Sequence, residues 1–190
     1  MTPMCPLMVD LRGKRVLLVG GGKAASLKAR FFSRFGASLR VVAPEVLPEL
    51  EALGPEEVRR RPFLEEDLEG VFLAVAASSD PRVNARVVEL CRRRGILCCA
   101  SGGGPTEVAV PSAVVRGPLV VSVSTSGLSP ALSRAMRELL EELLPGELGE
   151  RVEGLGRLRV RGLSQGEGVE EILGWLKGCL RAKVEGWDQG

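Results

Sequence analysis

The chain has 190 residues, of which 45% are hydrophobic and 26% charged, so it can build a hydrophobic core in one domain with an extension or in two small domains. Its formal net charge of +2 is too small to indicate nucleic acid as the main partner. The absence of histidine and tyrosine excludes Ser-His-Asp catalysis, histidine metal ligands and an imidazole or phenol as general acid.

Apolar runs alternate with helical patterns from residue 15 to residue 100. The predicted strands are 15–19, 38–43, 58–61, 71–77 and 96–100, and the predicted helices are 23–35, a short one through Leu47, Leu50 and Leu53, and 81–94. VFLAVAA (71–77) is continuously apolar, as expected for a strand buried on both faces. The alternation predicts an α/β fold with a parallel sheet and helices on both of its faces.

The pattern changes after residue 100. SGGGPTE (101–107) predicts a loop, AVVRGPLVVSVST (113–125) predicts two short strands around a Gly-Pro turn, and SPALSRAMRELLEELLP (129–145) predicts an amphipathic helix. That helix carries a broad apolar stripe outside the sheet, so we expect a second copy of the chain to cover it in a homodimer. Beyond it the pattern is weak, and one last helix is predicted from Val169 to Val184.

Three consecutive glycines separate the first predicted strand from the first predicted helix. In Gly20-Gly21-Gly22-Lys23-Ala24-Ala25 the first, third and sixth residues are Gly, Gly and Ala. In dinucleotide-binding proteins one glycine permits the tight turn, another lets the diphosphate approach the backbone, and a small sixth residue packs the helix on the strand. The amino end of the helix attracts the diphosphate with its N–H groups and its dipole. The segment therefore predicts a dinucleotide site.

The second strand leaves the choice between NAD and NADP open. It lacks the usual terminal Asp or Glu and ends Val42-Ala43-Pro44-Glu45, so Glu45 or backbone groups would have to hold the ribose. Arg40, inside the strand, could face a 2′-phosphate, although we interpret it as a solvated side chain.

The five cysteines are odd in number and form no CxxC pair, so we expect buried, reduced cysteines with no disulfide framework and no resident metal. The amino end lacks a secretory pattern, and no apolar run reaches membrane length. We therefore expect a cytoplasmic protein with no membrane partner. Abundant arginine and glutamate with a single asparagine, Asn84, favour a thermophilic source.

Several stretches resemble one known family in order and spacing. They are PLMVDLRGKRVLLVGGGKAASLK, VVAP, AVAASSDPRVN and VPSAVVRGPLVVSVSTSGLSPALSRAMRELLEELLP, which together cover residues 6 to about 150. The run STSGLSPALSRAMRE is the most specific, because a generic dinucleotide-binding fold has no reason to contain it. The chain thus resembles the precorrin-2 dehydrogenase/sirohydrochlorin ferrochelatase family, the NAD-dependent part of siroheme synthase.

The resemblance implies an NAD-binding Rossmann domain over residues 1–111, a dimerisation segment over 112–145 and a small helical part over 146–190. It also implies that NAD accepts a hydride as precorrin-2 loses two hydrogens to become sirohydrochlorin. In many members ferrous iron, as a substrate, is then inserted into that product.

The resemblance also implies site residues. The cofactor-binding positions that carry over are Gly20, Gly22, Lys23, Ala24, Pro44, Glu45, Ala77, Ser78 and Asp80. Because the macrocycle bears eight carboxylates, we expect arginines in its cleft. The substrate-binding candidates are Arg116, Arg134 and Arg137, with Lys28 a weaker one, and Thr125 and Ser126 in the loop Ser124–Gly127. We interpret the runs Arg59–Arg61 and Arg92–Arg94 as solvated ends of elements.

One family residue is missing. Counting back from Val110-Pro111-Ser112, the family's acid/base aspartate falls on Ser101, which cannot accept a proton unaided. Glu107 or Asp80 could supply the carboxylate, the substrate's own carboxylates or water could suffice, or the chelatase could be lost. We favour a retained dehydrogenase, with Ser101 and Glu107 as the catalytic candidates. The alternative is a sensor or carrier that binds NAD and a tetrapyrrole without catalysis.

Overall fold

The chain folds into two compact units. The computed structural model describes residues 3–102, 106–162 and 164–187, with side chains described only to residue 183 in the last helix. One unit runs from Cys5 to Val110, and the other begins at Pro111 and also includes Met4. The predicted loop 101–107 lies partly outside the described residues.

The first unit is built on a five-stranded sheet. Its strands are β1 (Arg15–Val19), β2 (Ser38–Val42), β3 (Glu57–Arg59), β4 (Leu73–Ala76) and β5 (Leu97–Ala100). They pair in the order β3-β2-β1-β4-β5, and every pairing is parallel. The predicted parallel α/β sheet is therefore confirmed, with each strand within three residues of its predicted bounds.

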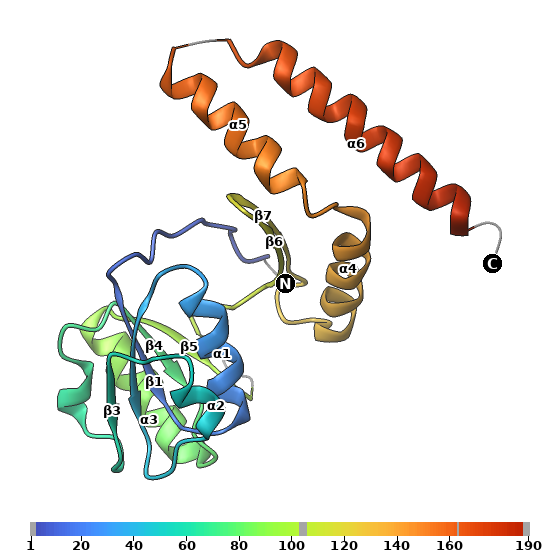
Figure 1. Cartoon of the computed structure of the whole chain (residues 1–190). Coiled ribbons are helices and arrows are strands. Elements are labelled where there is room, and N and C mark those ends of the chain that lie inside the picture. The colour runs from blue at the N-terminus through green and yellow to red at the C-terminus, as the bar shows by residue number, and fades with distance from the viewer. Residues whose placement is uncertain (1–2, 103–105, 163, 188–190) are drawn as a thin grey trace. The chain divides into compact units, whose positions relative to one another are not determined.

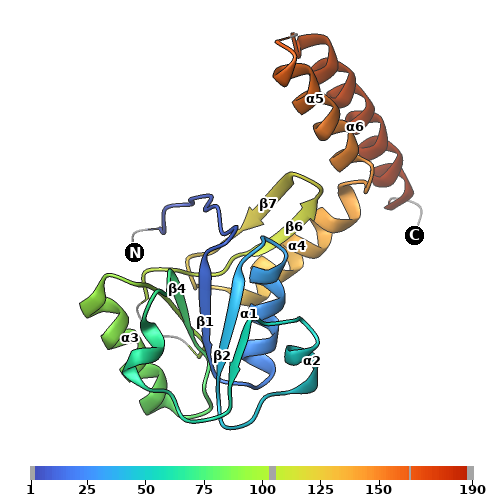
Figure 2. The same ribbon diagram turned by 60° about the vertical axis from the view of Figure 1, so that its left-hand side comes forward.

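Helices cover both faces of this sheet (Figure 1, Figure 2). They are α1 (Lys23–Ser33), α2 (Pro48–Glu51) and α3 (Pro81–Arg94), with a 3-10 turn, η1 (Glu65–Leu68), before β4. Alternate residues of β1 enter two separate cores: Val16 and Leu18 pack with α1 and α2, whereas Leu17 and Val19 pack with α3. This alternation follows from the two-residue period of a strand.

The second unit has a β-hairpin and three helices. They are β6 (Ser112–Arg116), antiparallel to β7 (Leu119–Val123), then α4 (Pro130–Leu143), α5 (Leu148–Val160) and α6 (Gly166–Trp187). The Ser129 hydroxyl accepts a hydrogen bond from the Leu132 N–H at 3.2 Å, so it caps α4. α5 was not predicted, and α6 is longer than the predicted helix. Within the described part of the chain, no helix combines the length and apolarity needed to cross a membrane.

Arg40 and Asp67 of the first unit are buried charged residues, and their contacts correct two expectations. Arg40 is not solvated: its Nε donates to Glu57 at 2.7 Å and its Nη1 donates to the Asp67 carbonyl at 3.1 Å. The Asp67 carboxylate is fully buried and binds Arg59 at 2.6 Å and Arg61 at 2.8 Å. Arg59 and Arg61 are therefore half-buried partners of an acid, not solvated ends. The sequence pattern could not show this, because the partners meet only through the loop before β4.

The cysteines are all free, as expected. Cys91, Cys98 and Cys99 are buried, whereas Cys5 is exposed and Cys179 is partly exposed, which corrects the expectation for those two residues. The run Arg92–Arg94 is exposed at the end of α3, in agreement with its interpretation as solvated.

Candidate functional site

The glycine loop after β1 is packed against its neighbours through bare backbone. Gly20 has φ +124°, which other residues rarely adopt, and a Cβ there would overlap the Ala77 carbonyl. A Cβ on Gly21 would overlap the Glu45 carbonyl. These two glycines therefore let the loops after β2 and β4 close on the end of β1.

Gly22 faces open space. A Cβ built on it would meet no atom within 4 Å, and the residue stands at the N-cap of α1 with no side chain to cap the helix. The first N–H groups of a helix have no partner inside the helix and carry a partial positive charge. Lys23 and Ala24, which follow, are exposed. The geometry fits a diphosphate at the amino end of α1.

Backbone hydrogen bonds hold the loops after β1 and β2 together at the carboxyl ends of the strands. The Gly20 N–H donates to the Val42 carbonyl at 3.0 Å, and the Leu47 N–H donates to the Gly21 carbonyl at 2.9 Å. Because β1 lies between β2 and β4, the chain crosses over here in opposite directions, and open α/β sheets bind nucleotides at such a point. The structure thus brings the glycine loop together with the exposed Pro44 and Glu45.

The loop after β4 is fixed by one amide side chain. The Asn84 amide accepts a hydrogen bond from the Ser78 N–H and donates one to the Ser78 carbonyl, both at 2.9 Å. Asp80 caps α3 by accepting from the Arg82 N–H at 2.8 Å. The hydrogen bonds from Arg82 hold the pKa of the Asp80 carboxyl below its usual range, so it is a poor proton acceptor. Asn84 was not among the predicted site residues, although it is the chain's single asparagine and ends the family-like stretch AVAASSDPRVN.

A hollow of about 500 Å³ lies beside this loop, at the ends of β4 and β5. Ser78, Asn84, Arg92 and Ser101 are among the side chains that line it. The Ser101 hydroxyl is buried and has no hydrogen-bond partner among the described residues. Glu107 is exposed and forms an ion pair with Arg92 at 3.7 Å. The hollow is therefore lined both by the Ser101 hydroxyl, which has no partner in the described part of the chain, and by Arg92, which forms the ion pair with Glu107.

The predicted arginines of the second unit have different surroundings. Arg116 donates to the carbonyls of Leu144 at 3.1 Å and Glu141 at 2.9 Å, so it caps the carboxyl end of α4. Arg137 forms ion pairs with Glu141 and with its neighbour Glu138, and Arg134 is exposed. Substrate binding by these residues stays a prediction. Lys28, in the first unit, donates to the Cys99 sulfur at 3.4 Å.

The loop before α4 holds strained backbone. Ser126 has φ +52°, a conformation that no other described non-glycine residue adopts. Its hydroxyl accepts from the Met4 N–H at 3.0 Å, and the Thr125 hydroxyl accepts from the Ser129 N–H at 2.9 Å. Strain of this kind clusters at functional sites. The loop leads the chain into α4, as any turn at this place must. It also stays a candidate for substrate binding.

Comparison with known proteins shows the family to which the chain belongs. Residues 7–112 match a family model described as putative NAD(P)-binding, and residues 116–143 match one described as sirohaem biosynthesis protein central. A solved structure titled SirC, precorrin-2 dehydrogenase superposes with a TM-score of 0.70 at 31% identity, over 90% of this chain and 88% of that one. The chain belongs to the precorrin-2 dehydrogenase family of siroheme biosynthesis.

Curated relatives are longer. The chain is 40% identical over 158 residues to siroheme synthase 1 of Serratia proteamaculans and 41% identical over 160 residues to siroheme synthase of Azotobacter vinelandii. These matches cover 81% and 80% of this chain but 33% of each relative. The chain thus spans about one third of the length of the curated relatives that it matches.

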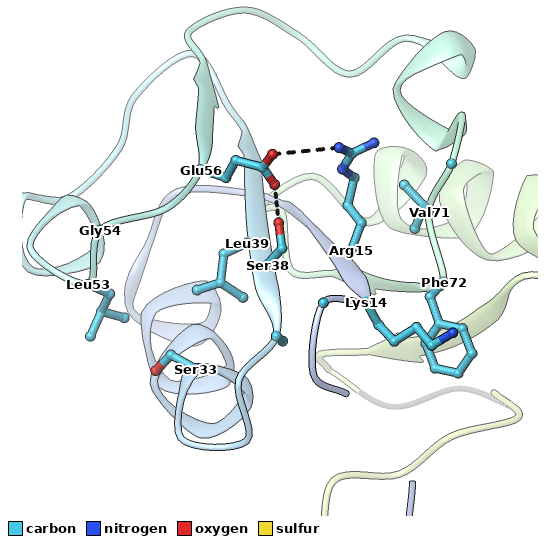
Figure 3. Close-up of a pocket in the computed structure, with 13 residues that line it drawn as sticks. Lys14, Arg15, Ser33, Ser38, Leu39, Leu53, Gly54, Glu56, Val71 and Phe72 are labelled. Carbon is cyan, nitrogen blue, oxygen red and sulfur yellow. Dashed lines mark hydrogen bonds and ion pairs between the residues drawn. The ribbon is translucent and has the colours of Figure 1, made fainter. Parts of the chain in front are cut away.

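Another hollow lies away from the nucleotide loops of this family member. Its volume is about 920 Å³, and it is lined by the residues that begin β1, β2 and β4. Figure 3 shows Glu56 there between Ser38 and Arg15, with its carboxylate 3.8 Å from the Arg15 guanidinium, and Lys14 over the Phe72 ring. Open α/β sheets bind ligands at the carboxyl ends of their strands, and this is the amino end. The hollow in Figure 3 is therefore not the nucleotide site.

Proposed function

We propose that the chain oxidises precorrin-2 to sirohydrochlorin with NAD as the hydride acceptor. The observation that carries this proposal is the open backbone at Gly22, at the amino end of α1, inside a chain that matches a precorrin-2 dehydrogenase over most of its length. NAD supplies the hydride acceptor when it is bound. The backbone around Gly22 would hold its diphosphate, beside the loops that follow β2 and β4.

Glu107 is the proposed proton acceptor for the oxidation. Its carboxylate is exposed and is held by one ion pair of 3.7 Å, whereas both Asp80 oxygens are bound by Arg82. The Ser101 hydroxyl can position a ligand by a hydrogen bond but cannot take the proton by itself. Ser101 and Glu107 therefore have separate proposed roles.

Turnover tests this proposal. Purified protein with precorrin-2 and NAD is expected to produce sirohydrochlorin absorbance, and NADH alone is expected to raise the melting temperature. Glu107→Gln is expected to lower turnover about 100-fold while the NADH-induced shift in melting temperature is retained. Ligand binding without turnover would instead support the sensor or carrier, and no response to NADH would remove the basis of the whole assignment.

Iron insertion is a separate proposal. Metal insertion must remove two pyrrole protons, and Ser101 stands where the family's aspartate would do so. No group of three or more Cys, Asp or Glu that could hold a metal lies among the described residues. We infer that the chain is a dehydrogenase with little chelatase activity, so ferrous ion added to the same assay should leave sirohydrochlorin unconverted.

A homodimer is the proposed assembly, formed through α4. Leu132 and Met136 lie one helical turn apart on this helix and are 53% and 39% exposed, so they offer an apolar surface that a second copy could cover. Leu132→Glu with Met136→Glu is therefore expected to give a monomer by light scattering at micromolar concentration. The matched control, Glu142→Lys at an exposed charged position of the same helix, should remain a dimer. A wild-type monomer would contradict this proposal without affecting the dehydrogenase assignment.

A cytoplasmic location and a thermophilic source stay predictions.

A further inference from the structure

The C-terminal hairpin contains a hollow with a strongly basic lining. α5 and α6 lie side by side (Figure 1, Figure 2), and a hollow of about 350 Å³ opens between them. Arg151, Arg157 and Arg161 line it from α5 and its carboxyl end, and Glu171 lines it from α6. Three guanidinium groups thus face a single carboxylate, which leaves an excess of positive charge in the hollow.

The floor of the hollow is fixed by close helix packing. A Cβ on Gly168 would lie 2.8 Å from the Leu155 Cδ2, so the backbone of α6 lies close to a side chain of α5 at this glycine. The Gln165 side chain also donates to the Leu155 carbonyl at 2.6 Å. The arginines are therefore presented by a packed hairpin.

Arg151 occupies an unfavourable place on its helix. It lies near the amino end of α5, where the helix dipole disfavours a cation. Its guanidinium is held 4.2 Å from the centre of the Trp175 ring and 3.6 Å from the Glu171 carboxylate. Stacking and pairing thus hold a cation at the wall of the hollow, where helix stability alone would not place one.

The guanidinium groups of Arg157 and Arg161 can bind a ligand. A Cβ on Gly154 would lie 3.7 Å from the Arg157 Nη2, so this guanidinium lies near bare backbone. Within the described residues, neither arginine has a carboxylate within 4 Å. A favourable interaction with the carboxyl end of α5 explains Arg157 and Arg159 in its last turn, but not Arg151 near its amino end. It does not explain three arginines around one hollow.

We propose that this hollow binds the carboxylate groups of a polycarboxylated ligand. Guanidinium forks bind carboxylates through two parallel hydrogen bonds, which a flat surface of lysines would not do. The volume is at the small end of the range for ligand sites, so it accommodates carboxylate arms and not a macrocycle ring. Resting on the proposed function, the ligand is a tetrapyrrole that carries several carboxylates.

Uroporphyrin, a porphyrin with eight carboxylates, is the probe. Trp187→Phe leaves Trp175 as the chain's one tryptophan, beneath Arg151, so its fluorescence reports on the hollow. Uroporphyrin is expected to quench this fluorescence in a saturable way that weakens with salt. In the same background, Arg157→Glu should weaken binding about five-fold. Arg159→Glu, which makes the same charge change on the same helix outside the hollow, should bind as before.

The outcomes separate this inference from the dehydrogenase assignment. Equal binding by all variants, or binding by none, would overturn the hollow as a carboxylate site. An unchanged NADH-induced rise in melting temperature shows that the charge-reversed variant is folded. Turnover of precorrin-2 by the chain that carries Trp187→Phe alone tests the dehydrogenase assignment separately. In the chain that carries Trp187→Phe alone, no quenching with normal turnover refutes only the hollow, and normal quenching without turnover refutes only the dehydrogenase.

Discussion

Gly21→Ala is expected to lower the free energy of unfolding by about 3 kcal/mol and to abolish NADH binding. The added Cβ would overlap the Glu45 carbonyl and lie 2.8 Å from the Val46 Cα. Both obstacles are backbone, so no side chain can rotate away to relieve the clash. The loop after β2 would have to move off the glycine loop, which its hydrogen bond from Leu47 now holds in place. Urea unfolding and NADH titration measure the two effects.

Gly22→Ala is the matched control and should separate binding from stability. Gly22 has φ −89°, which any residue adopts, and the space around its missing Cβ is empty. The free energy of unfolding should therefore change by less than about 0.5 kcal/mol. NADH should nevertheless bind at least about ten-fold more weakly, because the methyl group occupies the space where the diphosphate approaches the backbone. Unchanged NADH affinity in this variant would show that the diphosphate does not bind there.

The sheet was predictable because each of its signals is local. The apolar run of β4 and the helix α3 each carry their own boundaries: Pro81 begins α3, and Gly95, with φ +66°, ends it. The parallel arrangement then follows from the alternation of strands and helices. Such features depend on neighbours within a few residues, which a sequence displays directly.

The helix α5 was missed because a distant contact overrides its local pattern. It contains three glycines, Gly149, Gly154 and Gly156, which disfavour a helix. Gly149 is nevertheless needed, since a Cβ there would lie 2.7 Å from the carbonyl carbon of Arg116 on the β-hairpin. Gly149 thus lowers the helix propensity of the segment, but it also lets α5 pack against the β-hairpin, and this packing stabilises the helix.

The site was predictable to different degrees. The glycine loop follows from a spacing whose physical reason is known, and the structure gives Gly20, Gly21 and Gly22 distinct surroundings. The role of Asn84 depends on a turn that brings it back to Ser78, and the unpaired hydroxyl of Ser101 depends on burial. Neither can be read from residue types alone.

The second large effect is expected from the buried acid of the first unit. Asp67→Asn should lower the free energy of unfolding by about 3 kcal/mol, because breaking a buried ion pair leaves its partners uncompensated. The carboxylate accepts hydrogen bonds from Arg59 at 2.6 Å, from Arg61 at 2.8 Å and from the Leu64 N–H at 2.8 Å. An amide removes the charge that both guanidinium groups face and turns one acceptor into a donor. Urea unfolding at pH 7 measures the loss.

The neighbouring acid Glu66 gives a matched control. Its carboxylate is exposed and lies 3.5 Å from the Arg61 guanidinium. Glu66→Gln makes the same chemical change one residue away and should cost less than about 1 kcal/mol, as exposed ion pairs usually do. An equal effect of the two substitutions would mean that burial of Asp67 does not matter.

The dependence of stability on pH gives the same carboxylate a distinct signature. Burial raises the pKa of Asp67, but hydrogen bonds from Arg61, the Leu64 backbone and Arg59 outweigh burial, and the pKa lies below its ordinary value. The folded protein therefore releases this proton more readily than the unfolded chain. The stabilisation is complete above the unfolded-state pKa, near pH 4, and is lost as the pH falls through the folded-state pKa. Wild-type stability should thus fall below about pH 4 more steeply than that of Asp67→Asn, which has no such proton to bind. If stability falls equally with pH in the two proteins, a group other than Asp67 causes the loss of stability in acid.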